Sequence, residues 1–204
     1  FVKNKAGAIA SQAYVNPYLG IWGIDYLARG HSAAETLEYL KSRDEGFDFR
    51  QLGIVDNNGG SAAFTGKNCD SWRGDLTGPN YAIAGNMLVG VETLEAMKKS
   101  FESDETQPLA KRLLLALQAG YLAGGDKRGH QSAAVKVYGL EEYPIVDLRV
   151  DEHVDPISEL IRVYGVAETI LLPLIDSLPT MNADGKTLHL NRSVTTDNGI
   201  AAHY

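Results

Sequence analysis

The sequence predicts an α+β protein with four layers (αββα), in which helices flank two packed, mainly antiparallel sheets. The predicted elements follow the order strand, two helices, hairpin, strand, two helices, two strands, helix. The run Asn57-Asn58-Gly59-Gly60 is a strong hairpin signal, which makes the strands on either side of it antiparallel. Paired helices between antiparallel strands fit a layered α+β protein better than a doubly wound parallel sheet.

The first half of the chain contains clear start signals for its elements. The small apolar run 6–14 is typical of a buried strand. Asn16 followed by Pro17 predicts a capped helix over 18–28. Ser32 and Glu35 form a capping box, which predicts a helix from 33 to about 43. The strands expected around the hairpin turn and after it are 50–56, 61–65 and 81–85.

The second half is predicted to be two helices, two strands and a last helix. Apolar residues at helical spacing predict helices over 91–101 and 109–121, and strands are expected over 132–138 and 145–150. Asp155 before Pro156 predicts a capped helix through 164 that resumes after Gly165 to about 177, with Pro173 expected to kink or break it. Residues 1–178 would form one domain, and 179–204 an irregular extension.

Composition argues against several classes of partner. The 204 residues contain 19 Lys and Arg against 26 Asp and Glu, a net charge of −7. This acidic balance disfavours nucleic acid and anionic membrane surfaces as partners. No apolar run approaches the roughly 20 residues that a membrane span needs. The single cysteine, Cys69, cannot form an internal disulfide and fits a reducing, cytoplasmic compartment; we interpret it as a small, semi-buried side chain.

The stretch 124–134 (GGDKRGHQSAA) is the strongest candidate for a functional loop. It combines three glycines with Asp126, Lys127, Arg128 and His130. A glycine-rich turn lets backbone N–H groups approach a ligand, and the two cations suit a carboxylate or phosphate. The alternative is a helix-to-strand turn in which the glycines cap the helix and the charges face water or form ion pairs. The spacing matches neither a P-loop nor G-x-G-x-x-G.

Other polar residues are candidates at the predicted strand ends. Ser11 and Gln12 end a small-residue strand, and Asn86 follows another, where its amide could hold an oxyanion or form an Asx turn. His130 could act as a general base, although a surface turn histidine is the simpler interpretation. The acidic and histidine residues between 147 and 155 show no recognised ligand spacing, so no metal and no other cofactor are expected.

Several motifs together carry a resemblance to a known family. They are residues 11–17 (SQAYVNP), 65–66 (TG), 84–88 (AGNML), 124–134 (GGDKRGHQSAA) and 146–151 (VDLRVD). In this order they resemble the family labelled domain of unknown function 1028, over about residues 6–165. That family is similar to the Ntn (N-terminal nucleophile) hydrolases, which have an αββα sandwich. The resemblance implies hydrolysis of an amide bond by a Thr, Ser or Cys at the chain's N-terminus.

The resemblance also implies roles for individual residues. Family members begin one or two strands earlier than Phe1, so we expect the first strand and its nucleophile to be missing from this chain. Asn86 and backbone amides near Gly85 would hold the oxyanion. Asp126 and Lys127 would grip the substrate or orient the nucleophile, and Lys127 together with Arg128 would neutralise an anionic substrate. The substrate would be contacted by Ser11, Gln12, Arg128 and His130. The expected function is therefore that of an amidohydrolase of the N-terminal-nucleophile type, acting on a small amide and assembled as a homo-oligomer. The alternatives are a non-catalytic protein that binds a small anionic ligand on the same fold, or a structural oligomer module.

Overall fold

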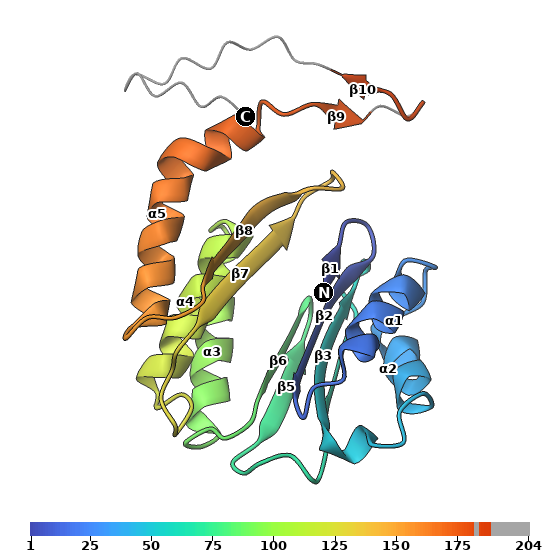
Figure 1. Cartoon of the computed structure of the whole chain (residues 1–204), viewed down its shortest axis with the longest axis vertical. Coiled ribbons are helices and arrows are strands. Elements are labelled where there is room, and N and C mark those ends of the chain that lie inside the picture. Colours follow the sequence, from blue (N-terminus) through green and yellow to red (C-terminus); the bar gives the residue numbers. More distant parts are fainter. Residues whose placement is uncertain (182–183, 189–204) are drawn as a thin grey trace.

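A computed structural model gives the structure of residues 1–181 and 184–188, to which the following description is confined (Figure 1). These residues form a mixed α/β structure with several small antiparallel sheets and five α-helices. Helices α1 and α2 lie on one side of the strands, and α3, α4 and α5 lie on the other.

The largest sheet has four strands in the order β1-β2-β3-β4, all antiparallel. Its bounds are Val2–Lys3, Gly7–Ala13, Arg50–Asp56 and Ser61–Thr65. Helices α1 (Pro17–Leu27) and α2 (Ala33–Lys41) pack on one face, where Leu19, Leu40, Leu52 and Ile54 are fully buried. The predicted hairpin at 57–60 is confirmed, because β3 and β4 pair on either side of it.

The predicted helix starts are also confirmed. The Asn16 side chain accepts a hydrogen bond from the Tyr18 N–H at 3.1 Å, with Pro17 at the first helical position of α1. Ser32 and Glu35 form both hydrogen bonds of the capping box at the start of α2. Each side chain satisfies a backbone N–H that has no partner inside the helix.

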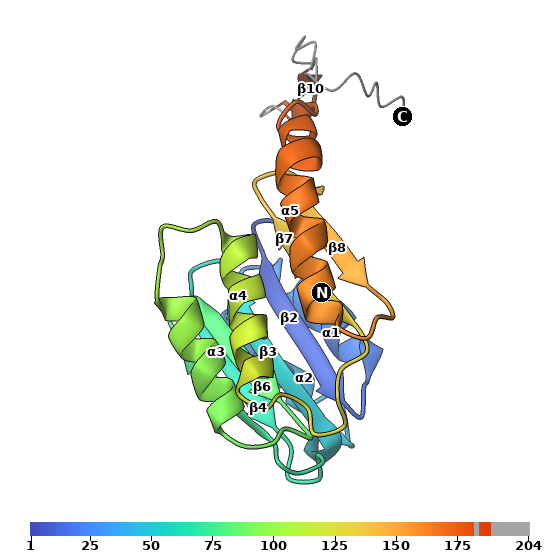
Figure 2. The ribbon, with the colours of Figure 1, turned by 90° about the vertical axis from the view of Figure 1, so that its left-hand side faces the viewer.

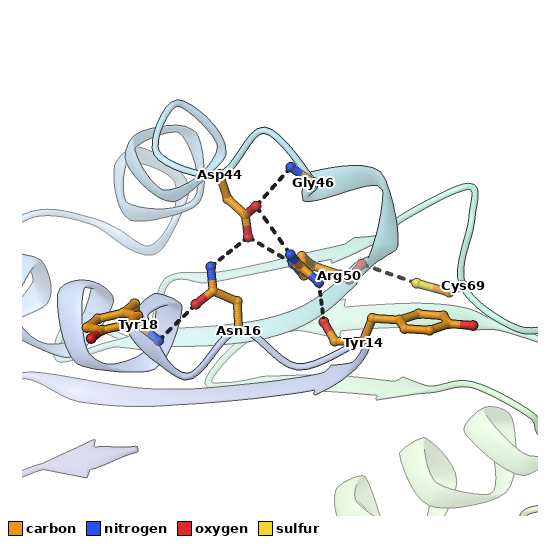
Figure 3. A network of polar contacts seen from close by, with 7 residues as sticks. All are labelled: Tyr14, Asn16, Tyr18, Asp44, Gly46, Arg50 and Cys69. Carbon is orange, nitrogen blue, oxygen red and sulfur yellow. Dashed lines mark hydrogen bonds and ion pairs between the residues drawn. The ribbon is translucent and has the colours of Figure 1, made fainter.

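A buried carboxylate joins the end of β2 to the start of β3 (Figure 3). Asp44, whose side chain is 7% exposed, accepts from Arg50 Nε at 2.8 Å, Asn16 Nδ2 at 2.9 Å and the Gly46 N–H at 2.9 Å. The hydrogen bond from Arg50 is the main reason that the pKa of Asp44 lies below its usual value. Arg50 also donates to the Tyr14 carbonyl at 2.6 Å. This network fixes the strand end that follows Gln12.

A second hairpin packs on the other face of this sheet. It consists of β5 (Gly74–Gly78) and β6 (Tyr81–Gly85), and β6 lies against β3. A Cβ placed on Gly53 would lie 3.3 Å from Ala82 Cβ, so small residues allow this close approach. Strand β6 matches the predicted strand, whereas β5 was not predicted. Its sequence, GDLTG, has a glycine at each end and no apolar alternation.

The remaining elements form the side shown in Figure 2. They are α3 (Glu92–Glu102), α4 (Leu109–Leu122), β7 (Ala133–Tyr138), β8 (Pro144–Val150) and α5 (Pro156–Ile175). Helix α3 packs on β5 and β6, and α4 and α5 pack on the β7-β8 hairpin. The predicted interruption after Gly165 is wrong, because α5 runs through both Gly165 and Pro173. Pro173 lies in the last turn, so little of the helix follows the one hydrogen bond that its missing N–H removes.

The predicted C-terminal extension is described only in part. Thr180–Met181 (β9) and Thr187–Leu188 (β10) pair as a short antiparallel ladder. Residues 182–183 and 189–204 lie outside the described part of the chain. Within that part, none of the helices is both long and apolar enough to cross a membrane.

Candidate functional site

A cavity of about 570 Å³ lies between the end of β6, helices α3 and α4, and the β7-β8 hairpin. Its wall combines apolar side chains with a set of polar ones. Five of the residues predicted from the sequence line it: Gln12, Asn86, Asp126, Arg128 and His130. These residues come from three separate segments of the chain, so the fold brings together what the sequence shows only as isolated motifs.

One wall of the cavity is organised by a buried glutamine. Gln51 on β3 is fully buried, and its Oε1 accepts from Gln12 Nε2 at 2.8 Å and from Asn86 Nδ2 at 3.0 Å. Gln12 Nε2 also donates to the Ala84 carbonyl at 3.0 Å. The two cavity-lining amides therefore share one acceptor, which holds them side by side.

The same glutamine connects the first sheet to the β5-β6 hairpin. Its Nε2 lies 2.9 Å from Thr65 Oγ1, 3.1 Å from the Gly74 carbonyl and 2.8 Å from the Gly85 carbonyl. Thr65 in turn donates to the Asp75 carboxylate. Sequence reasoning missed Gln51. The sequence alone carries no signal for it, because a polar residue on a strand requires buried partners only where both faces of that strand are covered, and this depends on the fold.

The glycine-rich turn caps α4 and then forms part of the cavity wall. The Gly125 N–H donates to the Gly120 carbonyl at 3.1 Å, and Gly125 has a φ of +57°. The turn is tied to the segment after β6, because Val89 N–H donates to Gly125 O at 3.0 Å and Lys127 N–H to Met87 O at 2.9 Å. The alternative interpretation of these glycines, that they cap the helix, is thus confirmed.

Asp126 and Arg128 form an ion pair at the cavity. The Asp126 carboxylate accepts from the Arg128 backbone N–H at 2.8 Å, from Nε at 3.0 Å and from Nη2 at 2.6 Å. These bonds from the Arg128 side chain are the main cause of the lowered pKa of Asp126. Arg128 itself is exposed, so part of its guanidinium remains open to a ligand.

A second such pair lies nearby. Arg149 Nε lies 3.2 Å from Asp151 Oδ1, and both residues line the cavity and are exposed. The wall therefore carries two arginines and two aspartates, whose formal charges cancel. The site is less cationic than the Lys127-Arg128 motif suggests.

His130 lies between α4 and the start of α5. Its ring meets the Tyr121 ring edge-on with centroids 4.3 Å apart, and its Nε2 lies 3.7 Å from Asp155 Oδ1. Nε2 is buried and makes no hydrogen bond to any described residue. Ser132 also lines the cavity, but among the described residues the unpartnered His130 Nε2 makes no hydrogen bond to its hydroxyl, as a base paired with a nucleophile would.

Two predicted site residues, Ser11 and Lys127, lie away from the cavity. Ser11 and Gln12 are neighbours on β2 and so point to opposite faces of the sheet. Gln12 faces the hairpin, and the Ser11 Oγ is buried on the side of α1 and α2 without a described partner. Lys127 is exposed, and its Nζ donates to the Ser71 carbonyl.

Two further expectations concern metal binding and Cys69. Among the described residues, no cluster of three or more His, Cys, Asp or Glu side chains is placed to hold a metal ion. Cys69 is buried, which raises the pKa of its thiol, and it donates to the Arg50 carbonyl at 3.3 Å. It therefore has the structural role expected of it.

Comparison with known proteins agrees with the resemblance carried by the motifs. A family model described as a family of unknown function (DUF1028) matches residues 1–160. Among solved structures, the crystal structure of protein SPO2555 from Silicibacter pomeroyi, with the same family description, is 30% identical with a TM-score of 0.80. That match covers 98% of this chain and 84% of the other. None of the curated proteins matches the chain. The chain therefore belongs to the DUF1028 family, a family of unknown function.

Proposed function

We propose that the cavity binds a small organic anion that also carries an amide group. The observation that carries this proposal is the meeting of two kinds of polar group in one cavity. The paired amides of Gln12 and Asn86 form one part of the wall, and the Arg128 and Arg149 ion pairs form another. Side-chain amides hydrogen-bond both the C=O and the N–H of an amide, and a guanidinium suits a carboxylate.

The size and lining of the cavity support a ligand of this kind. Its volume of about 570 Å³ falls within the range of roughly 300–1,000 Å³ that is usual for small-molecule sites. Apolar side chains, among them Leu88, Met97, Leu117 and Ile157, also line it. The ligand would therefore combine an apolar group with the amide and the charge.

Hydrolysis of the bound amide is a second candidate function. It is supported by the order of the layers: α1 and α2, the four-stranded sheet, the smaller hairpins, then α3 to α5, as expected for the αββα sandwich of Ntn hydrolases. In addition, Asn86 Nδ2 uses one N–H on Gln51, and its second N–H has no acceptor among the described residues. This N–H is suited to an oxyanion. We assign no nucleophile to this reaction.

Calorimetric titration with hippurate (N-benzoylglycine) and its uncharged amide, hippuramide, tests the binding proposal. The wild-type protein should bind hippurate more tightly, because only hippurate offers a carboxylate to Arg128. Arg128→Ala should weaken hippurate binding about two- to fivefold, the range for an exposed charge pair, and leave hippuramide unchanged. Arg29→Ala is the matched control, since Arg29 also forms an exposed pair with an aspartate but lies after α1.

The result of this titration and the later fate of the bound hippurate are both informative about function. Absence of binding by both compounds would contradict the proposed function. If hippurate binds, release of benzoate and glycine over time would support hydrolysis, and intact hippurate after prolonged incubation would leave binding alone as the function.

A further inference from the structure

Thr93 carries an unpartnered hydroxyl in the cavity wall. Thr93 lies in the first turn of α3 and is 3% exposed. Thr93 is one of the residues that line the cavity, and its Oγ1 is buried without a hydrogen-bond partner in the described part of the chain. Buried hydroxyl groups are nearly always hydrogen-bonded, so this one calls for a partner.

Neither of the usual helical roles of threonine accounts for this hydroxyl. The residue before α3, Val91, provides no side-chain cap, and its carbonyl already accepts from the N–H groups of Leu94 and Glu95. The Thr93 hydroxyl also makes no bond to a carbonyl of the preceding turn, the common arrangement of Ser and Thr within helices. Thr36 on α2 does make that bond, to the Ser32 carbonyl at 2.8 Å.

The surroundings of Thr93 are apolar and tightly packed. Gly120 of α4 lies opposite, where an added Cβ would be 2.6 Å from Met97 Cγ and 3.5 Å from the Thr93 carbonyl. Met97 and Leu117 line the same part of the cavity. A hydroxyl in this setting interacts strongly with any polar group that reaches it, because water does not compete freely.

The charges nearby decide which polar group this is. The residues of α3 that line the cavity, Thr93 and Met97, are uncharged. The arginines of the cavity belong to the glycine-rich turn and to β8 instead. A neutral acceptor therefore fits at Thr93, and the charged end of the ligand fits at Arg128.

We propose that Thr93 donates a hydrogen bond to the amide carbonyl of the bound ligand and thereby determines specificity. The ligand class that follows is an N-acylated amino acid. Its apolar acyl group would lie against Met97 and Leu117 and its carboxylate toward Arg128, and its amide would be bound by Thr93 as well as by the amides of Gln12 and Asn86. This inference rests on the proposed function and adds to it the orientation and the class of the ligand.

A pair of matched probes tests the role of Thr93. Hippurate carries the amide, and 4-phenylbutanoate has the same ring, the same spacing and the same carboxylate without the amide. Thr93→Val removes the hydroxyl at constant shape and should weaken hippurate binding about two- to tenfold, the range of one neutral hydrogen bond, while leaving 4-phenylbutanoate unchanged. Thr93→Ser, which retains the hydroxyl, should bind hippurate like the wild type.

Urea unfolding of the ligand-free variants separates this role from a structural one. Thr93→Val should be as stable as the wild type or more so, because it removes an unmatched hydroxyl. Thr36→Val is the matched control and should lose stability, because its hydroxyl is bonded within the helix. Equal hippurate affinity of wild type and Thr93→Val, or a loss of stability in Thr93→Val like that in Thr36→Val, would overturn the role of Thr93 alone. A wild-type protein that binds neither probe would contradict the proposed function, and this inference with it.

Discussion

Replacing Gln51 by leucine tests whether one buried side chain holds both the cavity amides and the contact between two sheets. Gln51 is fully buried, and the change keeps its approximate volume while removing its amide. The substitution removes the Oε1 that accepts from Gln12 and Asn86, and the two N–H groups that are shared among Thr65 Oγ1 and the carbonyls of Gly74 and Gly85.

The magnitude follows from the partners that are left behind. Two accepted and two donated bonds at about 1 kcal/mol each would amount to about 4 kcal/mol if they were independent. Two partners keep another bond, Gln12 with the Ala84 carbonyl and Thr65 with Asp75, and the buried leucine gains apolar contact. We therefore expect the free energy of unfolding to fall by about 3 kcal/mol, within the range for loss of a buried polar network.

Urea denaturation measures this loss. With a slope of about 2 kcal/mol/M, the midpoint should fall by about 1.5 M without a change of slope. Gln131→Leu, the same substitution at an exposed position, should change stability by less than about 0.5 kcal/mol. Equal midpoints for Gln51→Leu and Gln131→Leu would refute the view that Gln51 links the sheets.

Two further predictions concern the frame that holds the site. Gly66→Ala should lower the free energy of unfolding by about 2 kcal/mol or more, because its Cβ would lie 2.1 Å from the Asp48 carbonyl oxygen. Gly165→Ala in α5, where the added Cβ would meet no other atom, should raise the free energy of unfolding by about 1 kcal/mol. Equal urea midpoints of the two variants would contradict this contrast. Asp44→Asn should cost about 2–4 kcal/mol at pH 7, because it breaks the largely buried pair with Arg50. The pKa of Asp44 is lowered in the folded state, so its stabilisation is complete above the ordinary carboxyl pKa of about 4 and is lost as pH falls below it. Unfolding curves of the two proteins should therefore converge in acid, and a constant difference would contradict the role of the charge.

Local signals in the sequence predicted where most elements begin. The side chains of Asn16 and Asp155 cap α1 and α5, and a proline follows each of them. Each side chain accepts from a backbone N–H only two or three residues further along the chain. Such interactions depend on a few neighbouring residues, so they can be recognised without the fold. Strand β5 was missed because its pairing with β6, and not its own apolar pattern, makes it a strand.

The candidate site was predictable only in part, for a related reason. Asn86, Asp126 and Arg128 lie in polar, glycine-containing motifs that mark loops, and these loops do meet at the cavity. Gln51 and Thr93 lie inside a strand and a helix, where a single polar residue carries no local signal. Their importance comes from what surrounds them after folding. Ser11 was predicted as a site residue together with Gln12, but neighbouring residues in a strand face opposite sides of the sheet, so Ser11 points away from the cavity.

The central claim is that the cavity amides recognise the amide of a small anionic ligand, and NMR of the side-chain NH₂ groups tests it most directly. During titration with hippurate, the signals of Gln12 and Asn86 should shift together and saturate at one affinity. Those of exposed amides such as Asn58 and Gln131 should stay in place. Saturating shifts at Gln12 and Asn86 alone would support the account, and their absence at hippurate concentrations that saturate other signals would contradict it.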